Sequence, residues 1–316
     1  MHHEVGRRVF LRLAMGALAA AASPAPNTGR TPGLRVDIGD IRLFVDFEGP
    51  KLAPEGAVMH ERPSLLLLHG GPGGDHSLFR PVFSQLADIC HVVYYDHRGQ
   101  GRSDRSSPDK WNLAQWADDV VALCDVLGIS RPIVLGHSFG GMVAQAYAVR
   151  HPTHPAKLIL SSTHSAFRIN RSAAKFAALG HPECGELLRA VWASEDGELM
   201  ARYIGECIPQ YNRHTSQDPQ AVRRVIPSPE VTAHFYRPGG EAHTLDFLPQ
   251  LHKVRCPVLI LAGGADPITP VANAREMAAA LPAGLARLET IEGAGHRLFH
   301  EAEEIYFTHL RGFIKA

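Results

Sequence analysis

A serine in a glycine-rich turn is the first residue of this sequence whose surroundings point to catalysis. Ser138 lies in the segment Gly136–Gly140, Gly-His-Ser-Phe-Gly, which follows the apolar stretch Ile133–Leu135 and precedes a helix-like stretch. A serine on a sharp strand-to-helix turn projects its hydroxyl, and glycines two residues away on either side avoid a clash. The context predicts that Ser138 is a nucleophile; the alternative is a chance Gly-Ser turn.

A serine hydroxyl needs a base, and the sequence offers one in a suitable place. His296 lies in a glycine-rich loop after the strand-like stretch Leu288–Ile291, and Asp266 follows the strand-like stretch Val258–Leu261. The order Ser, Asp, His along the chain is the order found when a nucleophile sits on such a turn. We therefore expect His296 to act as the base and Asp266 to orient it. Taken singly, Asp266 could be a turn residue and His296 an ordinary loop histidine.

A second glycine-rich loop could stabilise negative charge on the substrate. The segment His69–Gly74, His-Gly-Gly-Pro-Gly-Gly, directly follows the apolar stretch Leu65–Leu68. We expect the backbone N–H groups of Gly71 and Phe139 to form an oxyanion hole. A phosphate-binding loop is the alternative, but no Gly-Lys-Ser or Gly-Lys-Thr follows.

A charged loop follows the next strand-like stretch. Asp96–Ser103 reads Asp-His-Arg-Gly-Gln-Gly-Arg-Ser and comes directly after Val92–Tyr95. We interpret Asp96 and Arg98 as structural residues that hold a loop at the wall of the active site. A catalytic role for Asp96 is the alternative.

Strand-like and helix-like stretches alternate from Gly33 onward, which predicts an α/β fold with a mostly parallel sheet covered by helices. The predicted strands are Ile41–Phe47, Leu65–Leu68, Val92–Tyr95, Ile133–Leu135, Leu158–Leu160, Val258–Leu261 and Leu288–Ile291. The predicted helices are Leu78–Leu86, Ala114–Leu127, Gly140–Arg150, Ala272–Leu281 and Glu301–Phe313. Thr269 and Pro270 suggest the N-cap and first residue of the fourth helix.

The alternation stops between residues 166 and 247. This stretch is more polar, has helical patches and lacks a clear buried strand. We expect a mostly helical cap at 166–247, inserted into a core formed by 31–165 and 248–316. A cap in this position would cover the carboxyl edge of the sheet, where α/β proteins bind their ligands.

The first thirty residues resemble an export signal and a linker. Arg7 and Arg8 precede an apolar stretch, Leu13–Ala22, which is followed by small residues and prolines. Ten apolar residues are fewer than the roughly 20 that span a bilayer, so no stable membrane anchor is expected. Paired arginines suggest the twin-arginine export machinery as a partner, cleavage after Ala22 and a periplasmic or extracellular protein. The alternative is a disordered tail on a cytoplasmic protein.

Composition argues against partners chosen by charge. Of the 316 residues, 32 are Lys or Arg and 32 are Asp or Glu, so the formal net charge is zero. Such a chain has no long-range field that attracts nucleic acid or an anionic membrane. The sequence contains no His-Glu-x-x-His segment and no tight Cys/His spacing, so we expect neither a metal ion nor another cofactor.

The five cysteines fall into two groups. Cys90, Cys124 and Cys256 lie in apolar stretches or beside predicted strands, so we expect buried thiols. Cys184 and Cys207 both lie in the predicted cap and could pair in an oxidising compartment. The sequence leaves open whether they do.

These motifs together resemble the α/β-hydrolase superfamily, and most of all its proline iminopeptidase branch. That branch carries His-Gly-Gly-Pro-Gly after the third strand, present here as His69–Gly73, and Asp-x-Arg-Gly-x-Gly-x-Ser, present as Asp96–Ser103. The resemblance covers nearly all of the chain after the first thirty residues. It implies a cap over the triad and release of an N-terminal residue, often proline, from short peptides without a cofactor.

Two residues depart from the pattern of this branch. Many members have Trp after the serine and Gly or Ser before it, whereas this chain has Phe139 and His137. The histidine form is commoner in general esterases, so a carboxylesterase or lactonase acting on small uncharged esters is the alternative. An inactive scaffold used for binding is disfavoured by the intact triad, and enzymes with an aspartate nucleophile are disfavoured by Ser138.

The resemblance also implies that acidic residues of the cap hold the free amine of the substrate. Glu206, Glu230 and Glu241 are the candidates in this sequence. A solvated surface carboxylate is the alternative for each of them.

Overall fold

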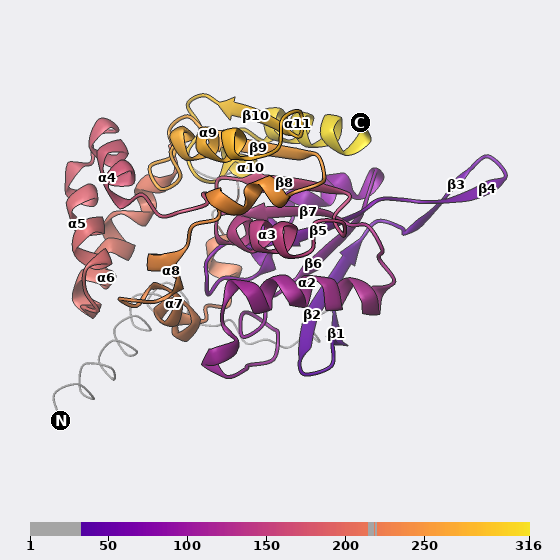
Figure 1. Cartoon of the computed structure of the whole chain (residues 1–316), viewed down its shortest axis with the longest axis horizontal. Coiled ribbons are helices and arrows are strands. Elements are labelled where there is room, and N and C mark those ends of the chain that lie inside the picture. The colour runs from indigo at the N-terminus through magenta and orange to yellow at the C-terminus, as the bar shows by residue number, and fades with distance from the viewer. Residues whose placement is uncertain (1–32, 214–217, 219) are drawn as a thin grey trace.

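The computed structural model describes residues 33–213, 218 and 220–316, and these residues contain an eight-stranded sheet (Figure 1). The strand order is β1-β2-β6-β5-β7-β8-β9-β10. Strand β2 pairs antiparallel with β1 and β6, and the remaining neighbours pair parallel. The bounds are β1 Leu34–Asp37, β2 Arg42–Glu48, β5 Ser64–Leu68, β6 His91–Tyr95, β7 Ile133–His137, β8 Lys157–Ser161, β9 Val258–Gly263 and β10 Ala286–Ile291. The predicted α/β fold is confirmed.

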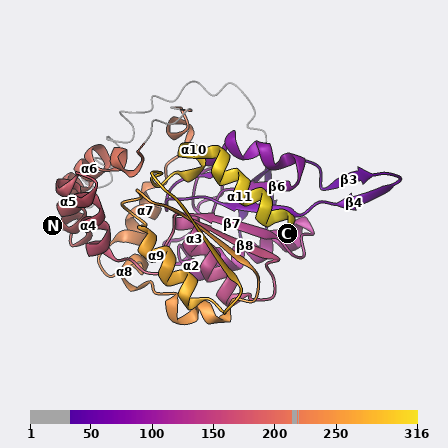
Figure 2. The same ribbon diagram turned by 90° about the horizontal axis from the view of Figure 1, so that it is seen from above.

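Helices cover both faces of the sheet, which explains why its central strands read as continuous apolar runs. Along β5, Leu66 and Leu68 pack into one hydrophobic cluster while Leu65 and Leu67 pack into the other. Helices α2 (Leu113–Leu127), α3 (Phe139–Arg150) and α9 (Val271–Ala280) contribute to the first cluster, and α11 (Glu303–Lys315) contributes to the second. Figure 2 shows α11 lying across the sheet on the side away from α2 and α3.

A helical segment separates β8 from β9. It contains α4 (Ile169–Ala178), α5 (Pro182–Trp192), α6 (Gly197–Glu206), α7 (Pro229–Tyr236) and α8 (Glu241–Thr244). An isolated antiparallel bridge between Ala166 and Asp246 joins the two ends of this segment. Helices α4, α5 and α6 stand to one side of the sheet (Figure 1). We refer to residues 166–247 as the cap.

The prediction of a helix at Leu78–Leu86 is wrong. The structure has two 3₁₀ helices there, η1 (His76–Phe79) and η2 (Val82–Asp88), which are separated at Arg80 and Pro81. Proline has no N–H to donate, so a regular α-helix does not run through this position. The other short 3₁₀ helices are η3 Pro108–Lys110, η4 Ile208–Tyr211, η5 Val222–Arg224 and η6 Leu248–Lys253.

The C-terminal helix is also divided. A short helix α10 (Leu298–Glu301) precedes α11, and Ala302 lies between them with an extended φ of −139°. Strand β1 and the hairpin β3–β4 (Leu52–Glu55 and Val58–Glu61) were not predicted. These strands are short and mostly exposed, so they lack the buried apolar run by which strands were recognised.

A disulfide joins Cys184 of α5 to Cys207, the residue that follows α6. Their Cα atoms are 5.4 Å apart, within the range that a disulfide requires. The other three cysteines are free and buried. Cys207 directly precedes η4, so the bond fixes the start of the segment that reaches the catalytic loops.

None of the helices in the described ranges is long and apolar enough to cross a bilayer.

Removing this disulfide should destabilise the protein. The bond closes a chain segment with a sequence separation of 23, and the loss of such a cross-link costs about 3 kcal/mol through the entropy of the unfolded chain. We expect the Cys184→Ser/Cys207→Ser variant to have a correspondingly lower free energy of unfolding in urea. Reductant should lower the stability of the wild type and leave the variant unchanged. Equal stabilities of the oxidised wild type and the variant would contradict the expectation.

Candidate active site

Ser138 occupies the turn between β7 and α3 in a conformation that few residues adopt. Its φ is 55° and its ψ is −119°. Glycine is required on both sides, because a Cβ on Gly136 would collide with the carbonyl oxygen of Gly140, and one on Gly140 with that of Leu68. The turn that the sequence predicts is therefore present, with its serine in a strained backbone conformation.

The structure brings the three predicted triad residues together. The distance between His296 Nε2 and Ser138 Oγ is 3.0 Å, and the distance between His296 Nδ1 and Asp266 Oδ2 is 2.8 Å. Asp266 is fully buried, and His296 is 7% exposed. A neutral imidazole in this arrangement donates from Nδ1 to the carboxylate and accepts at Nε2 from the hydroxyl.

Asp266 is held by its own loop as well as by His296. Its Oδ1 accepts hydrogen bonds from the N–H groups of Ile268 (2.8 Å) and Thr269 (2.9 Å), and the hydroxyl of Thr269 donates to Oδ2. Burial raises the pKa of Asp266, but the neighbouring His296 and these hydrogen bonds outweigh it and lower the pKa overall. The carboxylate is thus fixed in its ionised form.

Thr269 is a residue whose role sequence reasoning misassigned. We predicted it as the N-cap of α9, but the N-cap residue is Pro270, and the Thr269 side chain binds Asp266 instead. Asp and Thr three residues apart form local hydrogen bonds of this kind often enough that the spacing could have suggested the contact.

The loop that carries His296 is also bound by the cap. The N–H of His296 donates to the carbonyl of Tyr211 (2.8 Å), and the two rings lie 5.6 Å apart, edge to face. The N–H of Arg297 donates to Asn212 Oδ1 (2.9 Å). Glu301 accepts from the N–H groups of Gly295 (3.1 Å) and Arg213 (2.7 Å), so it joins the two segments. No sequence pattern pointed to these contacts.

The glycine loop after β5 lies against the nucleophile. A Cβ built on Gly70 would lie 3.4 Å from the Cβ of Ser138. Phe139 is the first residue of α3, where N–H groups have no partner within the helix. Gly71 has a φ of 138°, which only glycine adopts readily, and this conformation sets the direction of the loop backbone. Phe139 directly follows Ser138, and Gly71 directly follows Gly70, which lies against it; an oxyanion hole formed by their N–H groups stays a prediction.

Both residues that depart from the family pattern are packed into the core. Phe139 is fully buried and makes edge-to-face contacts with Trp116 (5.1 Å) and Phe235 (5.3 Å). The ring centroids of His137 and His296 lie 5.1 Å apart. Burial, assisted by the proximity of His296, lowers the pKa of His137 well below its usual value, so its ring is neutral.

The three candidate acids of the cap have different surroundings. Glu206 is exposed and pairs with Arg202 on the same helix at 3.1 Å. Glu230 lies 3.6 Å from Arg105 near the surface. Glu241 is partly buried and accepts from the N–H of Leu113 at 2.9 Å. Burial raises the pKa of Glu241. Glu206 and Glu230 are thus paired with arginines, whereas Glu241 is a partly buried carboxylate with a backbone partner.

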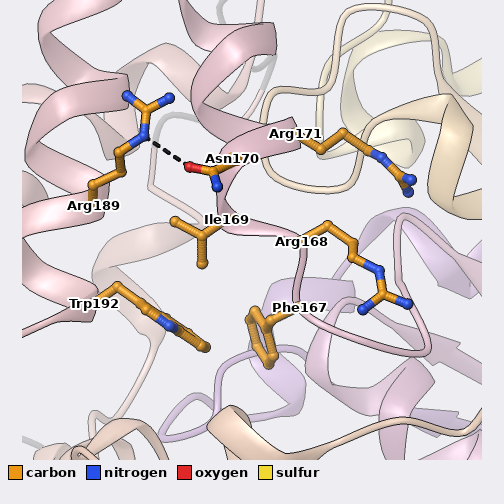
Figure 3. A pocket seen from close by; sticks show the side chains of 7 residues that line it. All are labelled: Phe167, Arg168, Ile169, Asn170, Arg171, Arg189 and Trp192. Carbon is orange, nitrogen blue, oxygen red and sulfur yellow. Dashed lines mark hydrogen bonds between the residues drawn. The ribbon is translucent and has the colours of Figure 1, made fainter.

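An open groove of about 600 Å³ lies on the cap beside the loop that follows β8. Its lining combines aromatic and cationic side chains, which Figure 3 shows together. The lining residues are Phe167, Arg168, Ile169, Asn170, Arg171, Arg189 and Trp192. This groove was not predicted, because its arginines come together only when the consecutive helices α4 and α5 pack against each other.

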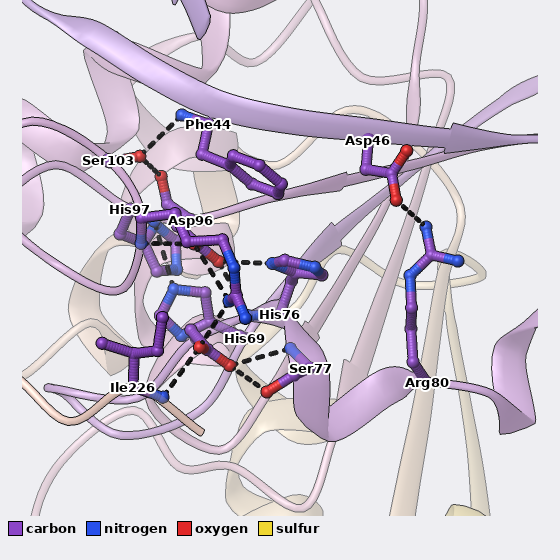
Figure 4. A network of polar contacts seen from close by, with 12 residues as sticks. Phe44, Asp46, His69, His76, Ser77, Arg80, Asp96, His97, Ser103 and Ile226 are labelled. Carbon is purple, nitrogen blue, oxygen red and sulfur yellow. Dashed lines mark hydrogen bonds and ion pairs between the residues drawn. The ribbon is translucent and has the colours of Figure 1, made fainter. Parts of the chain in front are cut away.

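Asp96 is a structural residue, as the sequence analysis expected (Figure 4). Its buried carboxylate accepts from the backbone N–H groups of His76 (2.9 Å) and Arg102 (2.7 Å), and its Oδ1 lies 2.6 Å from His76 Nδ1. Arg98 forms paired hydrogen bonds with Asp119 and with Asp40. Both side chains are thus occupied by contacts within the fold.

His69 connects the oxyanion loop to the loop that contains Asp96. Its Nε2 accepts from the N–H of His97 (3.1 Å), and its Nδ1 donates to the carbonyl of Gly70 (2.9 Å). Burial lowers the pKa of His69, which keeps the ring neutral and able to do both. In the described ranges, no cluster of three or more His, Cys, Asp or Glu residues could hold a metal ion.

Comparison with known proteins places this arrangement in a family. The family model described as alpha/beta hydrolase fold matches residues 63–303. A protein of Caulobacter sp. (strain K31) that is named "Putative carbamate hydrolase RutD" is 30% identical over 260 residues. The alignment covers 79% of this chain and 90% of that protein. The proline iminopeptidase of Lactobacillus helveticus (strain DPC 4571) is 29% identical over 279 residues, covering 80% and 90%.

Solved structures agree with the sequence comparisons. The proline iminopeptidase of Mycobacterium smegmatis superposes with a TM-score of 0.74 at 25% identity, covering 90% of this chain and 97% of that one. The enol-lactonase of Burkholderia xenovorans LB400 has the same fold, with a TM-score of 0.61 at 22% identity, covering 87% and 97%. The chain therefore belongs to the α/β-hydrolase family, near its proline iminopeptidase branch.

Proposed function

We propose that this protein is a serine hydrolase in which Ser138, His296 and Asp266 form the catalytic triad. Ser138 Oγ attacks the substrate carbonyl while His296 Nε2 accepts its proton, and Asp266 stabilises the charged imidazole. The N–H groups of Gly71 and Phe139 bind the developing oxyanion. His296 then protonates the leaving group, and a water molecule releases the acyl group from Ser138. The 3.0 Å contact between Ser138 Oγ and His296 Nε2 is the main support for this proposal.

Replacing the nucleophile tests the assignment. We expect Ser138→Ala to lower kcat by about 10⁶ and to abolish labelling by a fluorophosphonate probe, because the alanine has no attacking oxygen. Circular dichroism should show an unchanged fold. The control is Ser107→Ala, at an exposed serine, which should label like the wild type. Labelling of the Ser138→Ala protein would rule out Ser138 as the nucleophile.

For the substrate, we propose that the enzyme releases N-terminal residues, proline foremost, from short peptides. The similarity to proline iminopeptidases in sequence and in structure supports this class. Glu241 is the cap acid best suited to bind the substrate ammonium, since it is partly buried and forms no ion pair with an arginine of the described residues. Glu206 and Glu230 are less suited, because arginines already pair with them.

Acetylation of the substrate amine tests this class. Leaving a carboxylate unpaired in a partly buried site costs about 3 kcal/mol. An N-acetylated prolyl arylamide should therefore react at least 10²-fold more slowly than the free amine. Glu241→Gln should reduce kcat/KM for the free amine and leave the acetylated substrate unaffected. Glu206→Gln is the matched control and should change neither. Equal rates for the free and acetylated substrates would exclude the peptidase assignment.

Hydrolysis of small esters or lactones is the second candidate. Its specific support is the elbow residue His137 and the arginine pairing of two of the three candidate acids. An apolar acyl pocket would accept an uncharged ester without a counter-charge, so short-chain aryl esters would then outperform aminoacyl arylamides.

We also propose that the protein is exported through the twin-arginine machinery. The signal itself, its Arg7 and Arg8 and the cleavage site near Ala22 lie outside the described residues. Support comes from the Cys184–Cys207 disulfide, because such bonds persist mainly in oxidising compartments.

Changing the two arginines tests the export route. We expect Arg7→Lys/Arg8→Lys to retain the full-length chain in the cytoplasm with unaltered specific activity, since both residues precede the hydrolase fold. Cell fractionation and N-terminal sequencing give the answer. The control is Arg12→Lys, which should be exported like the wild type. Normal export of the double variant would contradict a twin-arginine signal.

A further inference from the structure

The groove on the cap is joined to the nucleophile by a short stretch of chain. The hydroxyl of Thr163 donates to the carbonyl of Ser138 at 2.7 Å, and Phe167 at the groove is four residues further on. Four residues span at most about 14 Å. His164 lies between them and packs against Phe167, with ring centroids 4.1 Å apart. The groove therefore begins within about 14 Å of the residue that contacts Ser138.

The groove is lined by three arginines and by no acidic residue. Arg171 is engaged by Glu276 and Asn273 of α9, and it holds α4 in place. Arg168 has a looser contact, 3.8 Å from Asp246, with 41% of its side chain exposed. Arg189 donates to Asn170 Oδ1 at 3.0 Å, a neutral partner. Two of the guanidinium groups thus retain donors for an additional anion.

Aromatic side chains form the rest of the groove wall. The rings of Phe167 and Trp192 lie 4.9 Å apart at 39°, and Trp192 stacks on His243 at 4.1 Å. Figure 3 shows Phe167 and Trp192 facing each other below Ile169, with the guanidinium groups above and beside them. Cations next to flat apolar surfaces suit a ligand that combines a carboxylate with an apolar or aromatic body.

Helix α8 connects this wall to Glu241, the proposed partner of the substrate ammonium. It carries both His243, which stacks on Trp192, and Glu241. Glu241 and the stacked His243 therefore lie two residues apart on one short helix of the cap. Such an arrangement can bind opposite charges at the two ends of one substrate.

We propose that the groove binds a carboxylate group of the substrate through Arg168 and Arg189, with Phe167 and Trp192 against the adjoining apolar part. The planar guanidinium fork can hold a carboxylate through two parallel hydrogen bonds. The proposal rests on the proposed hydrolase function, because it places the groove at one end of the substrate of Ser138. The carboxylate belongs either to the C-terminus of a short peptide or to the acyl part of a dicarboxylic monoester.

Binding to an inactive protein tests the groove apart from catalysis. Hippurate, an aromatic amide with a carboxylate, and hippuramide, its neutral counterpart, are titrated calorimetrically into the Ser138→Ala protein. We expect hippurate to bind at least tenfold more tightly, and Arg168→Gln/Arg189→Gln to remove the difference. Arg202→Gln, at an exposed arginine paired with Glu206, is the matched control and should leave it intact. Equal affinities, or a difference that survives the double substitution, would overturn the proposal.

Two pairs of substrates identify the source of the carboxylate in the active enzyme. Pro-Phe is compared with its C-terminal amide, and the 4-nitrophenyl monoester of glutaric acid with its methyl ester. The double substitution should lower kcat/KM at least tenfold for the acid of one pair and should spare both neutral compounds. An equal effect on acid and neutral members would show a general disturbance of the cap and overturn the assignment. Turnover of the neutral compounds reports separately on the triad.

Discussion

The active site depends on a single backbone constraint, the turn that holds Ser138 between β7 and α3. A φ of 55° is unfavourable for a residue with a side chain, so the surrounding structure must impose it. Strand β7 lies in the interior of the parallel sheet and α3 is fully packed, which fixes both ends of the turn. Gly136 and Gly140 allow the strand and helix to approach closely enough. The buried sheet and helix thus hold the nucleophile in a strained backbone conformation.

The other two triad residues are held from two sides, by the core and by the cap. The Asp266 loop receives Lys175 and Ser172 of α4, whose side chains donate to the carbonyls of Gly264 (2.7 Å) and Ile268 (3.0 Å). The His296 loop is bound by the segment that follows η4. The cap therefore positions the base and the acid in addition to covering them. Because Cys207 directly precedes η4, the disulfide stabilises the same segment that contacts His296.

The sequence was sufficient to predict seven of the eight strands of the sheet and the triad, because these leave local signals. Buried parallel strands such as Leu65–Leu68 read as apolar runs, and the elbow has obligatory glycines. Contacts that depend on tertiary structure left no such signal. The hydrogen bond from His296 to Tyr211 involves a backbone carbonyl, so nearly any residue could occupy position 211. The groove gathers Arg168 and Arg189 from different helices, and neither has a distinctive neighbourhood in the sequence.

The disposition of charge in the cap explains how a chain with no net charge could select a charged substrate. Formal neutrality removes long-range attraction, so recognition must come from side chains that lie close to the ligand. Some cap charges compensate one another, as Arg202 does with Glu206. Glu241 and Arg189 differ, because within the described residues Glu241 accepts from a backbone N–H and Arg189 donates to a neutral amide. Charges that lack an opposite partner are those available to a ligand. Glu241 is two residues from His243 on α8, and Arg189 lines the groove together with Trp192. Selectivity in this cap is therefore expected to act over a few ångströms.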